Sequence, residues 1–138
     1  MRKAFTLIEL LIVIAIIALL TALSLFALQE ARKSARDTKR KADLETIRGA
    51  LEMYRSDCSV YPDPDGDHVP SSIVGCNGEV YIQTTPTDST SPRAYYYGLA
   101  GLTYELCAAL EGNVDTLPTD CGGECGTGIT CNYRVINP

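Results

Sequence analysis

The sequence lacks the features by which most enzymes can be recognised. It contains a single histidine, no glycine-rich phosphate loop and no G-x-S-x-G nucleophile motif. No closely spaced pair of carboxylates occurs in a recognisable active-site motif. No serine or cysteine has an evident general base near it in the sequence. We therefore predict that the protein is not an enzyme and needs no organic cofactor.

Basic residues are scarce beyond residue 55, where Arg93 and Arg134 stand among many acidic side chains. The whole chain has 12 basic and 17 acidic residues, for a formal net charge of −5 at pH 7. This balance excludes a surface that is basic all over, so nucleic acid is not an expected partner. A length of 138 residues suits one domain and leaves no room for a multi-domain enzyme.

Glycine and proline are absent from residues 5–28, and Glu9 is the only charged residue in this apolar segment. As a helix the segment would be about 36 Å long, enough to cross a hydrocarbon core without an interruption in its hydrogen bonds. A cleaved secretory signal peptide is the alternative, but such peptides have a shorter apolar core and an A-x-A-like site, which is missing here. We expect the segment to be retained as a membrane-spanning helix.

Glu9 is unfavourable in such a helix. An ionised carboxylate costs roughly 2.5–3.5 kcal/mol near the membrane centre and less toward the edge. The Glu9 carboxylate should therefore take up a proton, pair with a cation, or reach the membrane interface near this end of the helix.

The residues around Glu9 resemble the processing signal of type IV prepilins and type II secretion pseudopilins. The resemblance rests on a short basic leader, a phenylalanine, a carboxylate at a fixed spacing and an apolar helix, in the order Arg2-Lys3-Ala4-Phe5-Thr6-Leu7-Ile8-Glu9. It implies that residues 1–4 are a leader peptide, that a peptidase cuts between Ala4 and Phe5, and that the new amino terminus is methylated. The family more often has glycine at the position of Ala4.

The same resemblance implies a structural subunit that is stored in the membrane as a single-pass protein. Subunits would then polymerise through residues 5–28 into a helical homopolymer, with the amine of Phe5 neutralising Glu9 of a neighbouring subunit. The implied partners are prepilin peptidase, an assembly ATPase and a membrane platform protein. The product would be a cell-surface type IV pilus or, alternatively, the periplasmic pseudopilus of a type II secretion system that moves exported proteins. A membrane-anchored binding domain that never polymerises is a further alternative.

The family usually carries a glycine and a proline within the apolar helix, where this chain has Ala18 and Phe26. Local melting of the helix in an assembled filament is therefore not expected. Thr21 and Ser24 can donate to helix carbonyls and bend the helix slightly.

Residues 29–57 are predicted to continue the helix as an amphipathic segment. Apolar positions recur on one face at Leu44, Ile47, Ala50, Leu51 and Tyr54. The opposite face is expected to carry Glu45, Arg48 and Glu52. The basic run at 32–41 is interpreted as a solvated helix face, and attraction to lipid headgroups or to acidic surfaces of adjacent subunits is the alternative.

Residues 58–138 are predicted to form a small disulfide-rich globular region. Short strands are expected at 94–97, 103–110 and 129–136, because glycine and proline bound these segments. They can form an antiparallel sheet that covers the apolar face of residues 44–54, so the predicted fold class is α+β. Residues 86–92 resemble the proline–aspartate loop of the major-pseudopilin branch.

All six cysteines lie beyond the apolar helix, and their even number favours three disulfides formed in an oxidising compartment. This argues that the C-terminal region lies outside the cytoplasmic membrane, as the family resemblance implies, although counting basic residues alone would place 32–41 inside. Fifteen connectivities exist. The expected pairs are Cys58–Cys76, Cys107–Cys131 and Cys121–Cys125. A zinc site that uses Cys121, Cys125 and Cys131 is the alternative.

Calcium is a candidate ligand of two acidic segments. Asp63, Asp65 and Asp67 alternate as in the start of a calcium loop, although Gly66 is misplaced and no bidentate glutamate follows at the required distance. Asp120 and Glu124 are a second candidate pair, because the major-pseudopilin branch binds calcium in its last loop. A solvated acidic loop is the alternative in both places.

Overall fold

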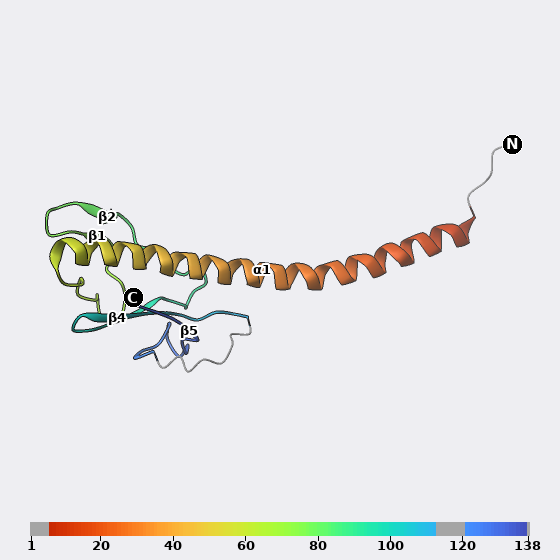
Figure 1. Cartoon of the computed structure of the whole chain (residues 1–138). Helices are drawn as coiled ribbons and strands as arrows, with labels where there is room; N and C mark the ends of the chain where they lie inside the picture. Colours follow the sequence, from red (N-terminus) through yellow and green to blue (C-terminus); the bar gives the residue numbers. More distant parts are fainter. Residues whose placement is uncertain (1–5, 113–120, 138) are drawn as a thin grey trace. The chain divides into compact units, whose positions relative to one another are not determined.

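The computed structural model describes residues 6–112 and 121–137. Its elements are α1 (Leu7–Cys58), β1 (Ile73–Val74), β2 (Val80–Ile82), β3 (Tyr96–Ala100), β4 (Thr103–Ala108) and β5 (Tyr133–Ile136), as Figure 1 shows. The chain divides into two compact units, with the boundary between Ala35 and Arg36 inside α1. One long helix with small antiparallel sheets confirms the predicted α+β class.

The first unit contains the apolar part of α1. Every residue from Leu7 to Leu28 is exposed, and the exposed fraction of Phe26 is 73%. A window of this helix has a mean hydropathy of 3.0 with 0% of it buried, so the helix is long and apolar enough to cross a membrane. The hydroxyls of Thr21 and Ser24 donate to helix carbonyls three or four residues earlier, as predicted, and so their polar groups are satisfied within the helix.

The second unit is built on the rest of α1 and a three-stranded antiparallel sheet of order β3-β4-β5. The helix contributes Leu44, Ile47, Ala50 and Leu51, each at most 1% exposed. The sheet contributes Tyr97, Tyr104, Leu106 and Val135 to the same core. The predicted apolar helix face and the predicted sheet that covers it are therefore both confirmed.

The two faces of this sheet have different partners, because side chains alternate along a strand. On β4, Leu106 packs in the core with α1, whereas Cys107 belongs to a second buried cluster that includes Tyr96, Cys125 and Cys131. The register pairs Leu106 with Tyr97 on one side and with Val135 on the other. The sheet thus separates the helix core from the cysteine-rich loop.

The strand boundaries differ from the prediction. β3 continues to Ala100 with Gly98 inside it, and β5 begins at Tyr133 rather than at residue 129. A Cβ at Gly98 would lie 2.6 Å from the Tyr96 hydroxyl, so a glycine in this strand reflects a close approach rather than a strand end. The sequence also did not predict the sheet of β1 and β2, because strands of two and three residues are too short for a hydrophobic period.

α1 ends at Cys58 without a glycine. Ser59 adopts a φ of 62°, in the left-handed region that usually closes a helix, and its amide donates to the Arg55 carbonyl at 2.8 Å. The helix end is thus closed by backbone geometry before Pro62, the first proline of the following loop, is reached.

Truncation of the helix core should destabilise the second unit. Ile47 is 0% exposed, so Ile47→Ala is expected to lower the free energy of unfolding by about 2–5 kcal/mol through lost burial and a residual cavity. Met53 lies on the same helix and is 49% exposed, so Met53→Ala should change the free energy of unfolding by less than about 0.5 kcal/mol. Chemical denaturation of the full chain in detergent, followed by near-ultraviolet circular dichroism, measures both. Equal effects of the two variants would contradict the packing described here.

Candidate functional site

The first turn of α1 is closed by Thr6 and Glu9. The amide and the hydroxyl of Thr6 donate to Glu9 Oε2 at 2.9 Å and 2.7 Å, and the Glu9 amide donates to Thr6 Oγ1 at 3.3 Å. This reciprocal arrangement is a capping box, in which two otherwise unpaired donors of a helix start are satisfied. The T-x-x-E spacing of Thr6 and Glu9 is the sequence signal for this cap.

The capping box gives Glu9 a partner within its own chain, besides the proton, the cation and the interface considered from sequence. A carboxylate offers about four acceptor positions, so the bonds from Thr6 leave room for a cation. A negative charge in the first turn is also favoured by the helix dipole. Ala4, Phe5 and the leader at 1–4 lie outside the described residues, so cleavage before Phe5 and its pairing with Glu9 stay predictions.

The apolar helix beyond Glu9 is exposed along its length. Its large side chains are roughly half exposed or more on all sides, for example Leu10 at 58%, Ile14 at 58% and Leu25 at 61%. A soluble helix would show one polar face. Because the backbone bonds are satisfied internally, this surface suits lipid or the same helix in other copies.

Charged side chains gather around the buried Arg40 in the second unit, and we term this group the Arg40 cluster. It consists of Arg36, Asp37, Arg40, Asp88 and Glu111. Arg40 is 2% exposed and places nitrogen atoms 2.6 Å from a carboxylate oxygen of Asp37, 2.6 Å from one of Asp88 and 2.9 Å from one of Glu111. Arg36 also pairs with Glu111. The cluster therefore ties the helix to the loop before β3 and to the segment after β4.

The carboxylates of this cluster are held in their charged form. The Arg36 guanidinium, together with Arg40, lowers the pKa of Glu111 from 4.5 to about 2 against the opposing effect of burial. Burial alone would raise the pKa of Asp37, but the amides of Glu111 and Gly112 and the Arg40 guanidinium outweigh it and lower that pKa. Among the described residues, no buried side-chain nitrogen or oxygen lacks a hydrogen-bond partner.

The predicted solvated role of residues 32–41 is therefore wrong for Asp37 and Arg40, which are buried, although Arg32, Lys39 and Lys41 are exposed. A signal for this burial exists in the sequence. Asp37 and Arg40 precede Leu44 by seven and four positions and so extend the apolar helix face by two more turns. The acidic partners of Arg40, however, lie far along the chain.

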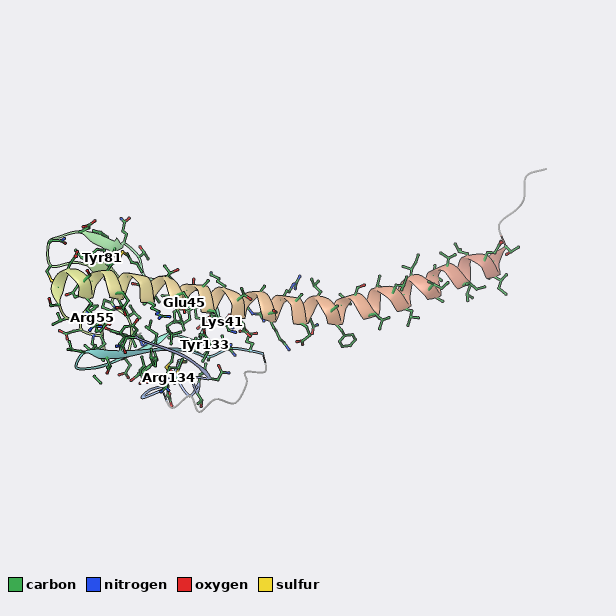
Figure 2. All side chains as sticks on the ribbon, viewed as in Figure 1. Lys41, Glu45, Arg55, Tyr81, Tyr133 and Arg134 are labelled. Carbon is green, nitrogen blue, oxygen red and sulfur yellow. A yellow bond between two sulfur atoms is a disulfide. The ribbon has the colours of Figure 1, made fainter. Side chains whose placement is uncertain are left out.

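Glu52 was expected on the exposed helix face and is instead half-buried. The hydroxyls of Tyr61 and Tyr104 each donate to a Glu52 oxygen at 3.0 Å, and the two rings meet edge to face at 4.8 Å. Burial, and then the hydrogen bond to Glu52, raises the pKa of Tyr104. Tyrosines satisfy other helix carboxylates in the same way, as Tyr95 does for Asp43 at 2.8 Å. On the same helix, the Lys41 ammonium lies over the Tyr133 ring, with Nζ 5.2 Å from the ring centroid (Figure 2).

The structure contains three disulfides. Cys58 is bonded to Cys76, the pair expected from sequence. The other two expected pairs are wrong: Cys107 is bonded to Cys121, and Cys125 to Cys131. Sequence spacing could not separate these alternatives, because the loop that follows Cys121 folds back and brings the Cys131 sulfur within 4.8 Å of those of Cys107 and Cys121. Since every described cysteine is in a disulfide, the alternative zinc site has no thiolate ligand.

The acidic residues proposed as calcium ligands do not form a cluster of ligand atoms among the described residues. Among the described residues, the only three metal-binding side chains with ligand atoms within 4.8 Å of one another are Cys107, Cys121 and Cys131. Asp63, Asp65 and Asp67 are exposed and do not form such a group. The Glu124 carboxylate accepts from the Gly128 amide at 2.9 Å, and Asp120 lies outside the described residues. Calcium binding at either place stays a prediction.

Comparison with known proteins matches the start of the chain to a family model. Residues 1–25 match the model described as the prokaryotic N-terminal methylation motif. The chain is 52% identical over 59 residues to the type IV wide pilus major component PilA4 of Thermus thermophilus, which is 43% of this chain and 45% of that protein. It is 30% identical over 98 residues to the type II secretion system core protein G of Pseudomonas aeruginosa, which is 63% of this chain and 67% of that protein. The chain thus spans less than half of the first relative, and no solved structure matches it.

Loss of the central cation should strongly destabilise the second unit. Arg40→Ala leaves the three carboxylates of Asp37, Asp88 and Glu111 without their shared partner, so the free energy of unfolding should fall by about 3–5 kcal/mol. The neighbouring Lys39 is exposed, so Lys39→Ala should change it by less than about 0.5 kcal/mol. Denaturation of the full chain in detergent measures both. A loss below about 1 kcal/mol for Arg40→Ala would contradict the cluster's role.

Acid should weaken the same cluster. Because the pKa of Glu111 is lowered from 4.5 to about 2 in the folded state, its stabilising effect is complete above pH 4.5 and is lost as the pH falls toward 2. Asp37 has a lowered pKa and acts in the same direction. Glu111→Gln should therefore lower the Tm at pH 6 and flatten its decline between pH 4.5 and 2. Glu79 is exposed, and Glu79→Gln should leave the Tm profile unchanged. Parallel profiles for Glu111→Gln and the unsubstituted protein would refute this account.

Proposed function

Because the chain belongs to the family of type IV pilins and type II secretion pseudopilins, we propose that it is the repeating subunit of a type IV pilus-like filament. The precursor is held in the cytoplasmic membrane by residues 7–28, with the globular region outside. Polymerisation then transfers this helix from lipid to a bundle of identical helices. The observation that carries the proposal is an apolar helix, exposed on all sides, whose only charge is Glu9 at its first turn.

Transfer of the helix between lipid and bundle requires no change in its backbone. The helix satisfies its own hydrogen bonds, and Thr21 and Ser24 bond back to it, so both surroundings meet the same apolar surface. Lipid tails are as apolar as leucine, and packing between helices supplies the gain on assembly. A helix of this kind can therefore leave the membrane when a machine supplies the work, for which the proposed partners are an assembly ATPase and a membrane platform protein.

Glu9 supplies the register of assembly in this proposal. Prepilin peptidase cuts between Ala4 and Phe5, and the new amine of one subunit lies against the Glu9 carboxylate of its neighbour. The bonds from Thr6 keep that carboxylate at the first turn, where an incoming amine can reach it. Leaving a buried charge unpaired costs several kcal/mol, so an axial shift that separates the pair is disfavoured.

The second candidate function is the pseudopilus of a type II secretion system. It is favoured by the length of the similarity to core protein G, which covers more of this chain than the similarity to PilA4 does. In that case the filament would be periplasmic and would act in moving exported proteins. Both candidates assemble through the same apolar helix and Glu9. They differ in whether the filament extends beyond the cell surface or stays in the periplasm. Electron microscopy of sheared cell-surface material separates them, since only a surface pilus is recovered there.

Removal of the Glu9 carboxylate should block assembly and spare membrane insertion. Glu9→Ala removes the partner of the Phe5 amine, so the yield of filaments should fall at least about tenfold, the factor that 1.4 kcal/mol produces. Glu30 is an exposed carboxylate on the same helix, and Glu30→Ala should assemble normally. Membrane fractionation, microscopy of sheared material and mass spectrometry of the amino terminus report insertion, assembly and processing separately. Normal filaments from Glu9→Ala would overturn the proposal.

A further inference from the structure

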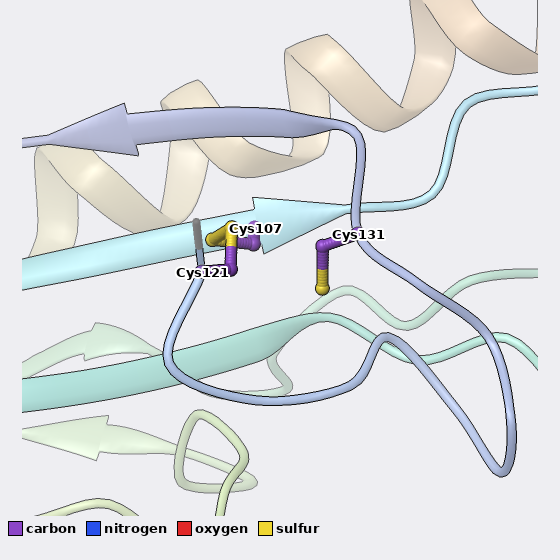
Figure 3. Close-up of side chains that lie close together, drawn as sticks. All are labelled: Cys107, Cys121 and Cys131. Atoms are coloured by element: carbon purple, nitrogen blue, oxygen red, sulfur yellow. A yellow bond between two sulfur atoms is a disulfide. The ribbon is translucent and has the colours of Figure 1, made fainter. Parts of the chain in front are cut away.

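Two disulfides lie side by side on the sheet face opposite the helix core. The Sγ atoms of Cys107, Cys121 and Cys131 all lie within 4.8 Å of one another, although Cys107 is bonded to Cys121 and Cys131 to Cys125. Figure 3 shows the Cys131 side chain beside the Cys107–Cys121 bond. Thiol–disulfide exchange proceeds by attack of a thiolate on a neighbouring disulfide sulfur. Each of these bonds therefore has a potential exchange partner at short range.

The four cysteines differ in access. Cys107 and Cys125 are 0% exposed and Cys131 is 2% exposed, whereas Cys121 is only partly buried. Exchange with an external thiol depends on which sulfur that thiol can reach. Cys121 is thus the least buried of the four residues, which makes its sulfur the favoured point of entry for an external thiolate.

The loop is held in place by contacts that do not need either disulfide. The Gly122 amide donates to the Glu105 carboxylate at 2.7 Å, the Ala94 amide donates to the Cys125 carbonyl at 2.9 Å, and the Cys125 amide donates to the Ile129 carbonyl at 2.9 Å. The first two bonds anchor the loop to β4 and to the segment before β3, and the third closes a turn within the loop. The sulfurs therefore stay gathered when one disulfide opens.

We propose that Cys121 is a site of covalent attack by an external thiolate, and that this attack interconverts two disulfide pairings within the cluster. The second pairing is Cys107–Cys131 with Cys121–Cys125. It closes one longer and one shorter loop than the pairing observed. In the chain-entropy model of the unfolded chain these changes largely cancel, so the proximity of the sulfurs in the folded chain is what favours exchange.

The exchange takes three balanced steps. The external thiolate bonds to Cys121 Sγ, and the Cys107–Cys121 bond breaks with Cys107 leaving as a thiolate. Cys107 then bonds to Cys131 Sγ, and Cys125 leaves as a thiolate. Cys125 bonds to Cys121, and the external thiolate leaves in its original form. Two disulfides are present at the start and at the end, so no electrons are gained or lost and the thiol acts as a catalyst.

The third disulfide should not take part. Cys58 and Cys76 are bonded to each other, and among the described cysteines neither belongs to a group with a third sulfur within 4.8 Å. No intramolecular thiolate of the cluster can reach them without unfolding. The Cys58–Cys76 bond therefore serves as an internal control for scrambling through unfolded chains.

The test uses the full chain in detergent with a mixture of reduced and oxidised glutathione at pH 8, followed by alkylation and digestion after glutamate. Cleavage at Glu105, Glu111 and Glu124 separates the fragments 106–111, 112–124 and 125–138. The observed pairing links only the first two fragments, whereas exchange links all three. The three-fragment species should rise above its level without glutathione as the incubation proceeds, because each exchange step regenerates the external thiolate. Thermolysin cleavage before Ile129 then distinguishes Cys107–Cys131 from Cys107–Cys125.

Matched variants separate local exchange from general scrambling. Cys125→Ser leaves Cys131 as a free thiol beside the Cys107–Cys121 bond, and should give links from Cys131 without any added glutathione. Cys76→Ser leaves Cys58 free, and should give no new links to the cluster. If glutathione leaves the observed pairing unchanged in the unsubstituted protein, or if Cys58 and Cys76 exchange as readily as the cluster, the proposal is wrong.

Discussion

The unbroken hydrogen bonding of α1 is the constraint on which the rest of the structure depends. No proline occurs between Leu7 and Cys58, and Gly49 is the only glycine there. Lipid offers no partner to backbone polar groups, so residues 7–28 can be apolar on all sides only because the helix satisfies those groups itself. Beyond Arg36 the same helix supplies the side chains around which the second unit packs, from Leu44 to Leu51. A break in the helix would remove both the exposed apolar surface and the framework of the core.

In both units, charged side chains that are removed from water are paired, because an unpaired charge in such a place is costly. In the first unit the only charge of the apolar segment is Glu9, and Thr6 satisfies it locally at the helix start. In the second unit Arg40 is buried with three carboxylates, which keep its guanidinium satisfied on several sides. The two arrangements have different structural effects. The capping box of Thr6 and Glu9 orders one helix turn, whereas the Arg40 cluster fixes two segments that are distant in sequence against the helix.

The second unit has a small core and a large share of loops, and cross-links compensate for the missing burial. Cys58–Cys76 joins the helix end to the segment between β1 and β2, while the other two bonds close the C-terminal loop over the sheet. Tyrosine hydroxyls bonded to helix carboxylates add polar links that pass through the core, as Tyr104 does to Glu52. Packing, ion pairs and covalent bonds thus hold the helix, the sheet and the loops of this unit together.

The sequence by itself determined the helix, its apolar face at residues 44–54, the existence of three short strands and the processing-type pattern around Glu9, because each is written in the spacing of neighbouring residues. The exact ends of the strands were not predicted. The sheet of β1 and β2 was also missed, because strands of two and three residues are too short to show an alternating hydrophobic pattern. The acidic partners of Arg40 and the pairing of Cys107 with Cys121 were decided by tertiary structure alone. These partners are distant in sequence or equivalent in spacing, so only the folded chain selects among them.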